Sequence, residues 1–273
     1  MTHRILIASF LVPLLLAAPS IALANECGPD PQAILQSVVP GVSLGEDGFL
    51  IPDGAAVFLP DTSGIGADPH AMICRNWPAQ PGLLLVALPL IAENTVDETM
   101  GDLALAILDA ESLSVLARTR LEDMMVEDAI YISDLAFDTA YYRLAPGRIA
   151  FGLRLTQQGS SRVNPLSVTT LWLFERQGKD IVTILDNLAV HRSGGEWDGR
   201  CAGAFHTDTR TLAMADETMN GVAIIALSSD HEAILSTLEK DSCEQQAIAS
   251  TSTQTLPFDG AAYIVPDDLH RGW

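Results

Sequence analysis

The feature that most constrains the fold is the pattern of short apolar runs, which are separated by polar turn-forming residues. Residues 113–121 alternate between apolar and polar side chains, and they follow the apolar run 103–108 after a short polar stretch. A second pair of runs, 169–174 and 181–185, is joined by the polar segment 176–180, which contains a glycine. Two strand-like runs on either side of a short polar turn, one of them with period-two alternation, are typical of a β-hairpin. The sequence therefore predicts two antiparallel hairpins in the middle of the chain.

The rest of the chain has the same character. Further strands are predicted at 55–59, 83–88, 148–156, 202–206, 211–214, 221–228 and 261–265. Helices are predicted only at 31–39 and at 230–240, where Ser229 and Glu232 have the spacing of a capping box. Many short strands with turn signals between them indicate an all-β, mainly antiparallel fold of the β-sandwich kind with one or two short helices. A β-propeller is the alternative.

The N-terminus has the features of a secretory signal peptide spanning residues 1–24. Arg4 precedes an apolar run over 5–18, and Ala22-Leu23-Ala24 is a small-x-small cleavage site. We therefore expect a mature protein of residues 25–273 that folds as a single β-rich globular domain. The next apolar run has only ten residues, 83–92, so we expect no membrane span after cleavage. Thirteen arginines against two lysines, together with this signal, favour the bacterial periplasm over the extracellular space.

Four cysteines remain after cleavage, an even number in a chain that we expect to be exported. None of them forms a C-x-x-C pair, and their spacing fits no common zinc pattern. Disulfides are the interpretation that suits an oxidising compartment, and four cysteines allow three pairings. We expect Cys27 to pair with Cys74 and Cys201 with Cys243, because each bridge then closes a loop within one end of the chain.

The charge is strongly negative and unevenly spread. The whole chain carries −20, and removal of Arg4 with the signal peptide gives −21. Residues 25–117 hold 13 acids and one base, 118–210 hold 12 acids and 11 bases, and 211–273 hold ten acids and two bases. An acidic chain is a poor binder of nucleic acid. Acidic ends are typical of a solvated surface, and they also suit a docking face for a cationic envelope or secreted protein.

One segment, 193–201, has the composition of a recognition loop. Its three glycines permit tight turns, Trp197 offers a large rigid contact surface, and a disulfide at Cys201 would limit the loop's freedom. Glu196 and Asp198 flank the tryptophan and complete the predicted binding set. The alternative for Trp197 is that it folds inward and caps the core.

No motif predicts a catalytic, cofactor or metal site. The chain has no G-x-S-x-G and no phosphate-binding lysine motif, and His231-Glu232 is followed by Leu235 where a zinc-binding helix needs a second histidine. His70 and His270 are isolated in the sequence, whereas His191 and His206 lie on either side of the glycine-rich segment. These two histidines, with Glu196 or Asp198, would form an acid–base or metal site only if that segment folded back between two strands.

These observations favour a non-catalytic protein that works by binding another envelope or secreted protein, for example as an inhibitor or an immunity protein. A periplasmic hydrolase that uses paired carboxylates is the alternative from another class, and a structural envelope component is a third. A pocket with converging carboxylates or histidines would favour the hydrolase. A flat or convex surface that carries Trp197 would favour the binding protein.

Overall fold

A computed structural model describes residues 26–28, 30–45, 48–60, 68–240 and 242–271. The segment predicted as a signal peptide lies outside the described residues. The described part is almost entirely β-structure with one α-helix. Its elements are α1 Pro31–Val38, β1 Ser43–Leu44, β2 Phe49–Leu50, β3 Ala56–Val57, β4 Ile73–Asn76, β5 Leu83–Asn94, β6 Thr99–Asp109, β7 Val115–Leu121, β8 Ile130–Ala145, β9 Arg148–Gly159, β10 Leu166–Gln177, β11 Asp180–Trp197, β12 Gly203–Met219, β13 Val222–Glu239, β14 Ser242–Leu256 and the 3₁₀ turn η1 Asp267–Leu269.

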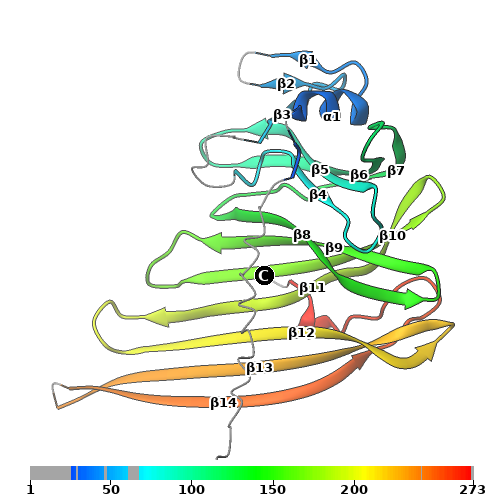
Figure 1. Cartoon of the computed structure of the whole chain (residues 1–273). Helices are drawn as coiled ribbons and strands as arrows, with labels where there is room; N and C mark the ends of the chain where they lie inside the picture. The colour runs from blue at the N-terminus through cyan, green and yellow to red at the C-terminus, as the bar shows by residue number, and fades with distance from the viewer. Residues whose placement is uncertain (1–25, 29, 46–47, 61–67, 241, 272–273) are drawn as a thin grey trace, which may run out of the picture.

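All the strands belong to one open, mainly antiparallel sheet (Figure 1). Its first part runs β1-β2-β3-β5-β6-β7, with β4 also on β5, and its second part runs β8-β9-β10-β11-β12-β13-β14. The two parts meet at a single parallel pair, Asp180 of β11 with Arg118 of β7. A continuous sheet of this kind differs from the separate radial sheets of a propeller. The all-β, sandwich-like prediction is therefore confirmed.

Three buried clusters of apolar side chains pack the parts of this sheet against each other, against the helix and against the C-terminal segment. The first lies between the helix and one face of β4, β5 and β6, and it includes Leu35 and Val86. The second lies between the other face of β5 and β6 and the strands β8, β9 and β10, with Trp77 and Phe151 in edge-to-face contact. The third packs β10, β11 and the root of β13 against the C-terminal segment that contains Tyr263. The burial of apolar side chains in these clusters is the main stabilising term for the fold.

Local sequence signals account for the two hairpins and the helix. The predicted hairpins are β6 with β7 and β10 with β11, each in antiparallel register. The predicted helix 31–39 is α1, which begins with Pro31 in its first turn and is capped by the Asp30 carboxylate, 3.0 Å from the backbone nitrogen of Ala33. Its apolar face, Ile34, Leu35 and Val38, is buried.

The second predicted helix, 230–240, is wrong. Residues 230–239 lie in strand β13, which pairs with β12 on one side and with β14 on the other, and Lys240 lies in the turn that follows. Ser229 and Glu232 lie in the strand and cap no helix. Hydrogen bonding to two neighbouring strands satisfies the backbone at every position, and this long-range pairing overrides a local preference worth less than about 1 kcal/mol per residue.

Both predicted disulfides are present. Cys27 is bonded to Cys74 and Cys201 to Cys243, with Cα atoms 4.8 Å and 5.8 Å apart. The described residues contain no free cysteine. Two disulfides are typical of a chain that folds in an oxidising, exported environment. Among the described residues, no helix has the length and apolar character needed to cross a membrane.

Candidate functional site

The predicted recognition residues lie on the most exposed part of the sheet. We define the arm as residues 193–197 of β11, 203–209 of β12, 230–239 of β13 and 242–251 of β14, which pair in that order. In Figure 1 it forms the left-hand ends of the lowest strands. Apart from Gly194 and Ser236, none of its residues is buried. The arm is therefore a sheet with solvent on both faces, unlike the roots of the same strands.

The strand register assigns every side chain of the arm to one of two faces. Residues directly opposite each other in adjacent strands share a face. Phe205 pairs with Ile234, and Gly203, which pairs with Trp197, also pairs with Ser236. Trp197, Phe205, Ile234 and Leu238 therefore share one side, which we call the tryptophan face. The opposite side, the Leu235 face, is continuous with the buried core at the strand roots, because it carries the odd-numbered residues of β13, including Ile225 and Leu227.

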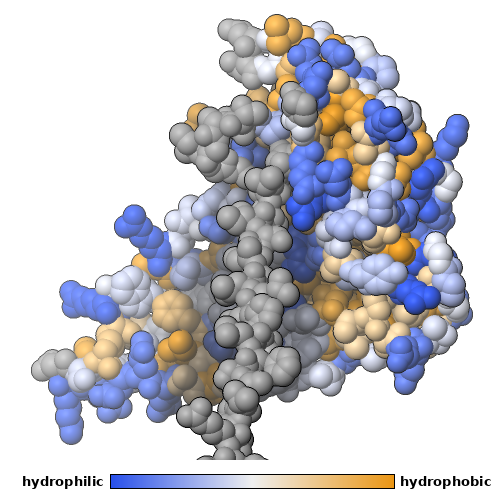
Figure 2. Space-filling model, viewed as in Figure 1, coloured by the Kyte–Doolittle hydropathy of each residue, from blue (hydrophilic) through white to orange (hydrophobic). Residues whose placement is uncertain are grey.

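Large apolar side chains are exposed on both faces of the arm. The exposed fractions are 39% for Trp197, 40% for Ile234, 62% for Leu238, 48% for Leu235 and 67% for Ile248. Figure 2 shows apolar and charged residues intermixed at this end of the molecule. The side chain of Trp197 therefore does not cap the buried core. A contiguous group of exposed apolar residues on one structural element is typical of a surface that binds another macromolecule.

The segment predicted as a recognition loop is for the most part a strand. Ser193–Trp197 pair residue by residue with Gly203–Thr207, and only residues 198–202 form the turn. Of its glycines, only Gly199 has a positive φ, +81°. The segment is thus a loop only at residues 198–202, because Gly194 and Gly195 lie in the paired strand and leave room for the side chains of His206 and Phe205.

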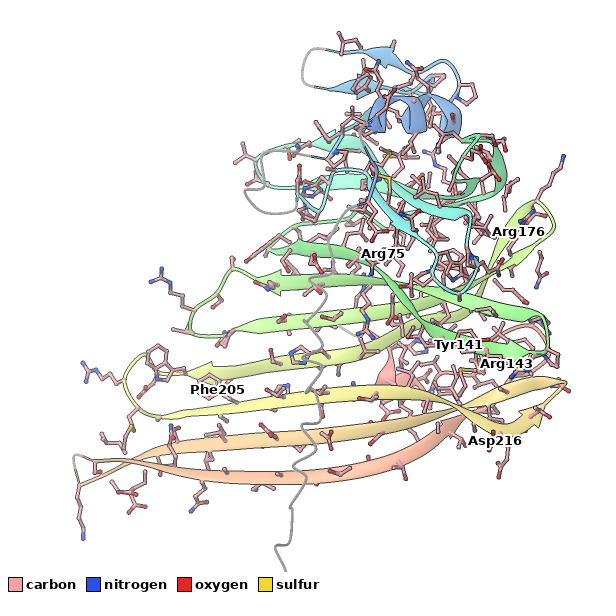
Figure 3. All side chains as sticks on the ribbon, viewed as in Figure 1. Arg75, Tyr141, Arg143, Arg176, Phe205 and Asp216 are labelled. Atoms are coloured by element: carbon pink, nitrogen blue, oxygen red, sulfur yellow. A yellow bond between two sulfur atoms is a disulfide. The ribbon has the colours of Figure 1, made fainter. Side chains whose placement is uncertain are left out.

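The glycines of the arm make room for aromatic rings. A Cβ atom on Gly195 would lie 2.6 Å from Cδ1 of Phe205, and a Cβ on Gly203 would lie 3.0 Å from Cε2 of the same ring and 3.3 Å from Cδ1 of Trp197. Phe205 thus lies over the bare backbone of two neighbouring strands. Its position on the projecting half of β12 is labelled in Figure 3. Two glycines and two aromatic side chains therefore form one flat aromatic patch on the tryptophan face.

The turn that follows Trp197 is held by Asp198 and by a disulfide. One carboxylate oxygen of Asp198 accepts hydrogen bonds from the backbone N–H groups of Arg200 and Cys201, at 2.8 and 2.9 Å. These bonds, with other nearby backbone N–H groups, hold the pKa of Asp198 below its usual value. The bond from Cys201 to Cys243 then ties the turn to the start of β14. Asp198 is therefore a structural residue of the turn.

The three predicted binding residues do not share one face. Trp197 lies on the tryptophan face, whereas Glu196, its neighbour along the strand, lies on the Leu235 face. The acids that accompany Trp197 come from β13 instead: Asp230 and Glu232 occupy the same face and are exposed. Sequence reasoning missed these acids, together with Phe205, Ile234 and Leu238, because only the strand register shows which residues share a side with the tryptophan.

The predicted pair of histidines does not converge. His191 pairs with Thr209 on the tryptophan face, and its Nδ1 lies 3.3 Å from the hydroxyl of Thr209. His206 pairs with Gly194 and therefore lies on the Leu235 face. On that face the Nδ1 of His231 is 2.9 Å from a carboxylate oxygen of Asp208. An acid–base site that combines His191 with His206 is thus ruled out by the sheet itself.

A closer histidine–carboxylate pair lies in the first part of the sheet. The Nε2 atom of His70 is 2.8 Å from Oε2 of Glu127, and its Nδ1 is 3.2 Å from Asp68. The hydrogen bond to Glu127 raises the pKa of His70, against the opposing effect of burial. The other oxygen of Glu127 accepts the backbone N–H of Ile132. Both oxygens of this nearly buried carboxylate are therefore engaged within the protein.

Two further groups of acids beside surface hollows are paired with arginines. Glu26 lies 2.9 Å from Arg75 beside Trp77 and Pro78, and Arg120 lies between Asp53 and Asp102 at 2.7 and 2.6 Å. Within the described ranges, no group of three or more His, Cys, Asp or Glu side chains is arranged to hold a metal ion.

In comparisons with known proteins, no family model, no curated protein and no solved structure matches this chain.

Proposed function

We propose that this chain is an exported, non-catalytic binding protein that uses the tryptophan face of its arm to bind another envelope or secreted protein. The observation that carries this proposal is the patch of Trp197, Phe205, Ile234 and Leu238 on a sheet that is exposed on both sides. Aromatic side chains at the centre of a flat patch are typical of the residues that dominate the binding energy in protein interfaces.

The acidic residues of the arm support a cationic partner. Asp230 and Glu232 lie on the same face as the aromatic patch, and the whole chain carries −20. Complementary charge around an apolar centre speeds association and excludes partners of the wrong sign. An inhibitor of, or an immunity protein against, a basic enzyme is one concrete form of this function. The signal-like N-terminus, the two disulfides and the excess of arginine over lysine support a bacterial periplasm as its compartment.

The arm is built for binding with little loss of entropy. Its backbone is paired along four strands, the Cys201–Cys243 bond ties its turn to β14, and the Phe205 ring is fixed over Gly195 and Gly203. A surface that is already ordered loses less conformational entropy when it meets its partner.

The test is affinity capture from envelope extract with the oxidised protein as bait, in parallel with two variants. Trp197→Ala removes the largest side chain of the patch, and Val96→Ala removes an apolar side chain at the turn between β5 and β6, where Val96 is fully exposed. We expect a basic protein to be captured by the wild type and by Val96→Ala, and to be lost with Trp197→Ala. Equal recovery by all three baits would refute the proposal.

A further inference from the structure

We propose that the free edge of β14 pairs with the β14 edge of a second copy of this chain, so that the two sheets join across a two-fold axis. This inference does not depend on the proposed function, because it concerns the edge of the arm and the protein alone. β14 is the last strand, and β13 is the one strand that pairs with it among the described residues (Figure 1).

The edge of β14 is long, regular and open. β13 and β14 pair at fifteen successive positions, from Ile225 with Leu256 to Glu239 with Ser242, with no shift of register. Every residue of β14 except Leu256 is exposed. The outer row of backbone N–H and C=O groups therefore faces solvent along the whole strand. Such a row is a template for another strand.

The usual protections of a free edge are absent from this strand. β14 contains no proline, no lysine, no arginine and no bulge, and its one charged residue is Glu244 near the beginning. Side chains along its middle are small or neutral, which leaves room for a neighbouring strand. Natural proteins normally block an exposed edge with charges, prolines or bulges, because an unblocked edge associates. An open edge on a long strand therefore indicates that pairing occurs here.

Charge decides which strand fits. A basic strand could form an ion pair only with Glu244 of β14, although the chain is strongly acidic elsewhere. The edge instead suits a neutral strand, and β14 itself is one. In an antiparallel pairing centred on Ala249, Glu244 lies opposite Gln254 of the second copy, so no two charges on the paired strands face each other.

The acids on β13 do not oppose this association. Asp230 and Glu232 lie one strand in from the edge, so three strand spacings, about 14 Å in total, separate them from the same row in the second copy. That separation exceeds the Debye length of about 8 Å at physiological salt. The apolar side chain of Ile248, 67% exposed, lies one residue from the proposed axis and gains cover from the second copy.

Light scattering on the purified, oxidised protein tests the proposal. We expect a molar mass of twice the chain. Ala249→Lys and Ala249→Glu place like charges opposite each other across the axis, which destabilises the pairing, so each variant alone should dissociate at least tenfold more readily than the wild type. Ala249 also pairs with Glu232 of its own chain, which repels an introduced glutamate and attracts an introduced lysine, so the dissociation of Ala249→Lys is the decisive result. Mixing the two variants should restore a dimer, which an unfolded chain would not do. Val96→Lys, at the turn between β5 and β6, should leave the dimer intact.

Hydrogen exchange locates the interface. In the dimer, the outward-facing amides of β14 should be protected, and in Ala249→Lys they should exchange at the rate of solvent-exposed amides. A wild-type protein that is a monomer at every concentration would overturn the proposal, and so would a dimer that withstands both Ala249 variants. A dimer in which the outward amides of β14 exchange freely would place the interface elsewhere and would overturn it as well.

Discussion

The Nε2 atom of His70 lies 2.8 Å from a carboxylate oxygen of Glu127, although 57 residues separate the two in the sequence. The contact joins the turn before β4 to the segment before β8. Burial by itself would raise the pKa of Glu127, but the hydrogen bonds from His70 and from the backbone of Ile132, with the positive charge of His70, lower it below its ordinary value of 4.5. The hydrogen bond to Glu127, together with the negative charges of Glu127 and Asp68, raises the pKa of His70 above its ordinary value of 6.5.

This pair makes stability depend on pH in two windows of opposite sign. The raised pKa of His70 gives stability that is fully present below pH 6.5 and is lost as the pH rises through the folded value. The lowered pKa of Glu127 gives stability that is present above 4.5 and is lost as the pH falls through its folded value. Above pH 6.5 the melting temperature of the wild type should decrease with rising pH. We expect this decrease to be smaller in His70→Gln. An unchanged slope in the variant would show that the pair is not coupled to folding.

Removal of each of the two disulfides should lower the free energy of unfolding by a different amount. Each closes a loop of similar length, with sequence separations of 47 and 42, so the chain-entropy model assigns each about 4 kcal/mol as an upper figure. Cys27 and Cys74 are buried in the cluster under α1, whereas Cys243 is exposed. Cys27→Ala with Cys74→Ala should therefore lower the free energy of unfolding more than Cys201→Ala with Cys243→Ala, because it also leaves a cavity.

Denaturant titration of both double variants measures this difference. Hydrogen exchange should show that loss of the Cys201–Cys243 bond speeds exchange in the arm while the buried strands β5 and β6 stay protected. Equal losses of global stability in the two double variants would contradict this account of the arm as an exposed extension of the sheet.

A methyl group on Gly195 should disturb the aromatic patch. Its Cβ would clash with the carbonyl oxygen of Ala204 and would lie 2.6 Å from Cδ1 of Phe205, so both the backbone of β12 and the ring must move. We expect Gly195→Ala to cost roughly 1 to 3 kcal/mol of stability, as overpacking does, and to weaken binding through the tryptophan face. Gly159→Ala is the control, because its Cβ meets nothing closer than 3.4 Å and its backbone is extended. Thermal denaturation of the two variants gives the comparison, and equal melting temperatures would show that Phe205 does not rest on Gly195.

The hairpins were predictable because each is a local pattern. Along β7, side chains alternate between a buried and an exposed face, and the turn residues lie between two such runs. Five strands were not predicted, namely β1, β2, β4, β8 and β14, and the two long ones among them lack that signal for different reasons. β8 changes register three times along β9, which breaks the alternation, and β14 has solvent on both faces, so nothing selects apolar residues at every second position.

The candidate site, like the strands, could be predicted only where the signal is local in the sequence. Trp197 stood out in the sequence as a lone aromatic residue among glycines, and the Cys201–Cys243 pairing followed from where the two cysteines lie in the chain. Phe205 and Ile234 could not be assigned to the same site from the sequence. They belong to other strands, and only the pairing of β11, β12 and β13 brings them to the same face as Trp197. The incorrect prediction of a helix at 230–240 also excluded Ile234 from the site, because a residue in a helix could not pair with Phe205 in a sheet.

The most direct test of the binding proposal is the kinetics of association with the captured partner, measured at several salt concentrations. Exposed acids steer a cationic partner over about one Debye length, about 8 Å at physiological salt, so rising salt should mainly slow association. Trp197→Ala should mainly speed dissociation and cost about 2 kcal/mol or more of binding free energy. Its melting temperature should fall only slightly, because Trp197 is 39% exposed and belongs to none of the three buried clusters. A variant that binds with unchanged affinity but melts earlier would assign Trp197 to the fold and contradict the proposed role of the tryptophan face.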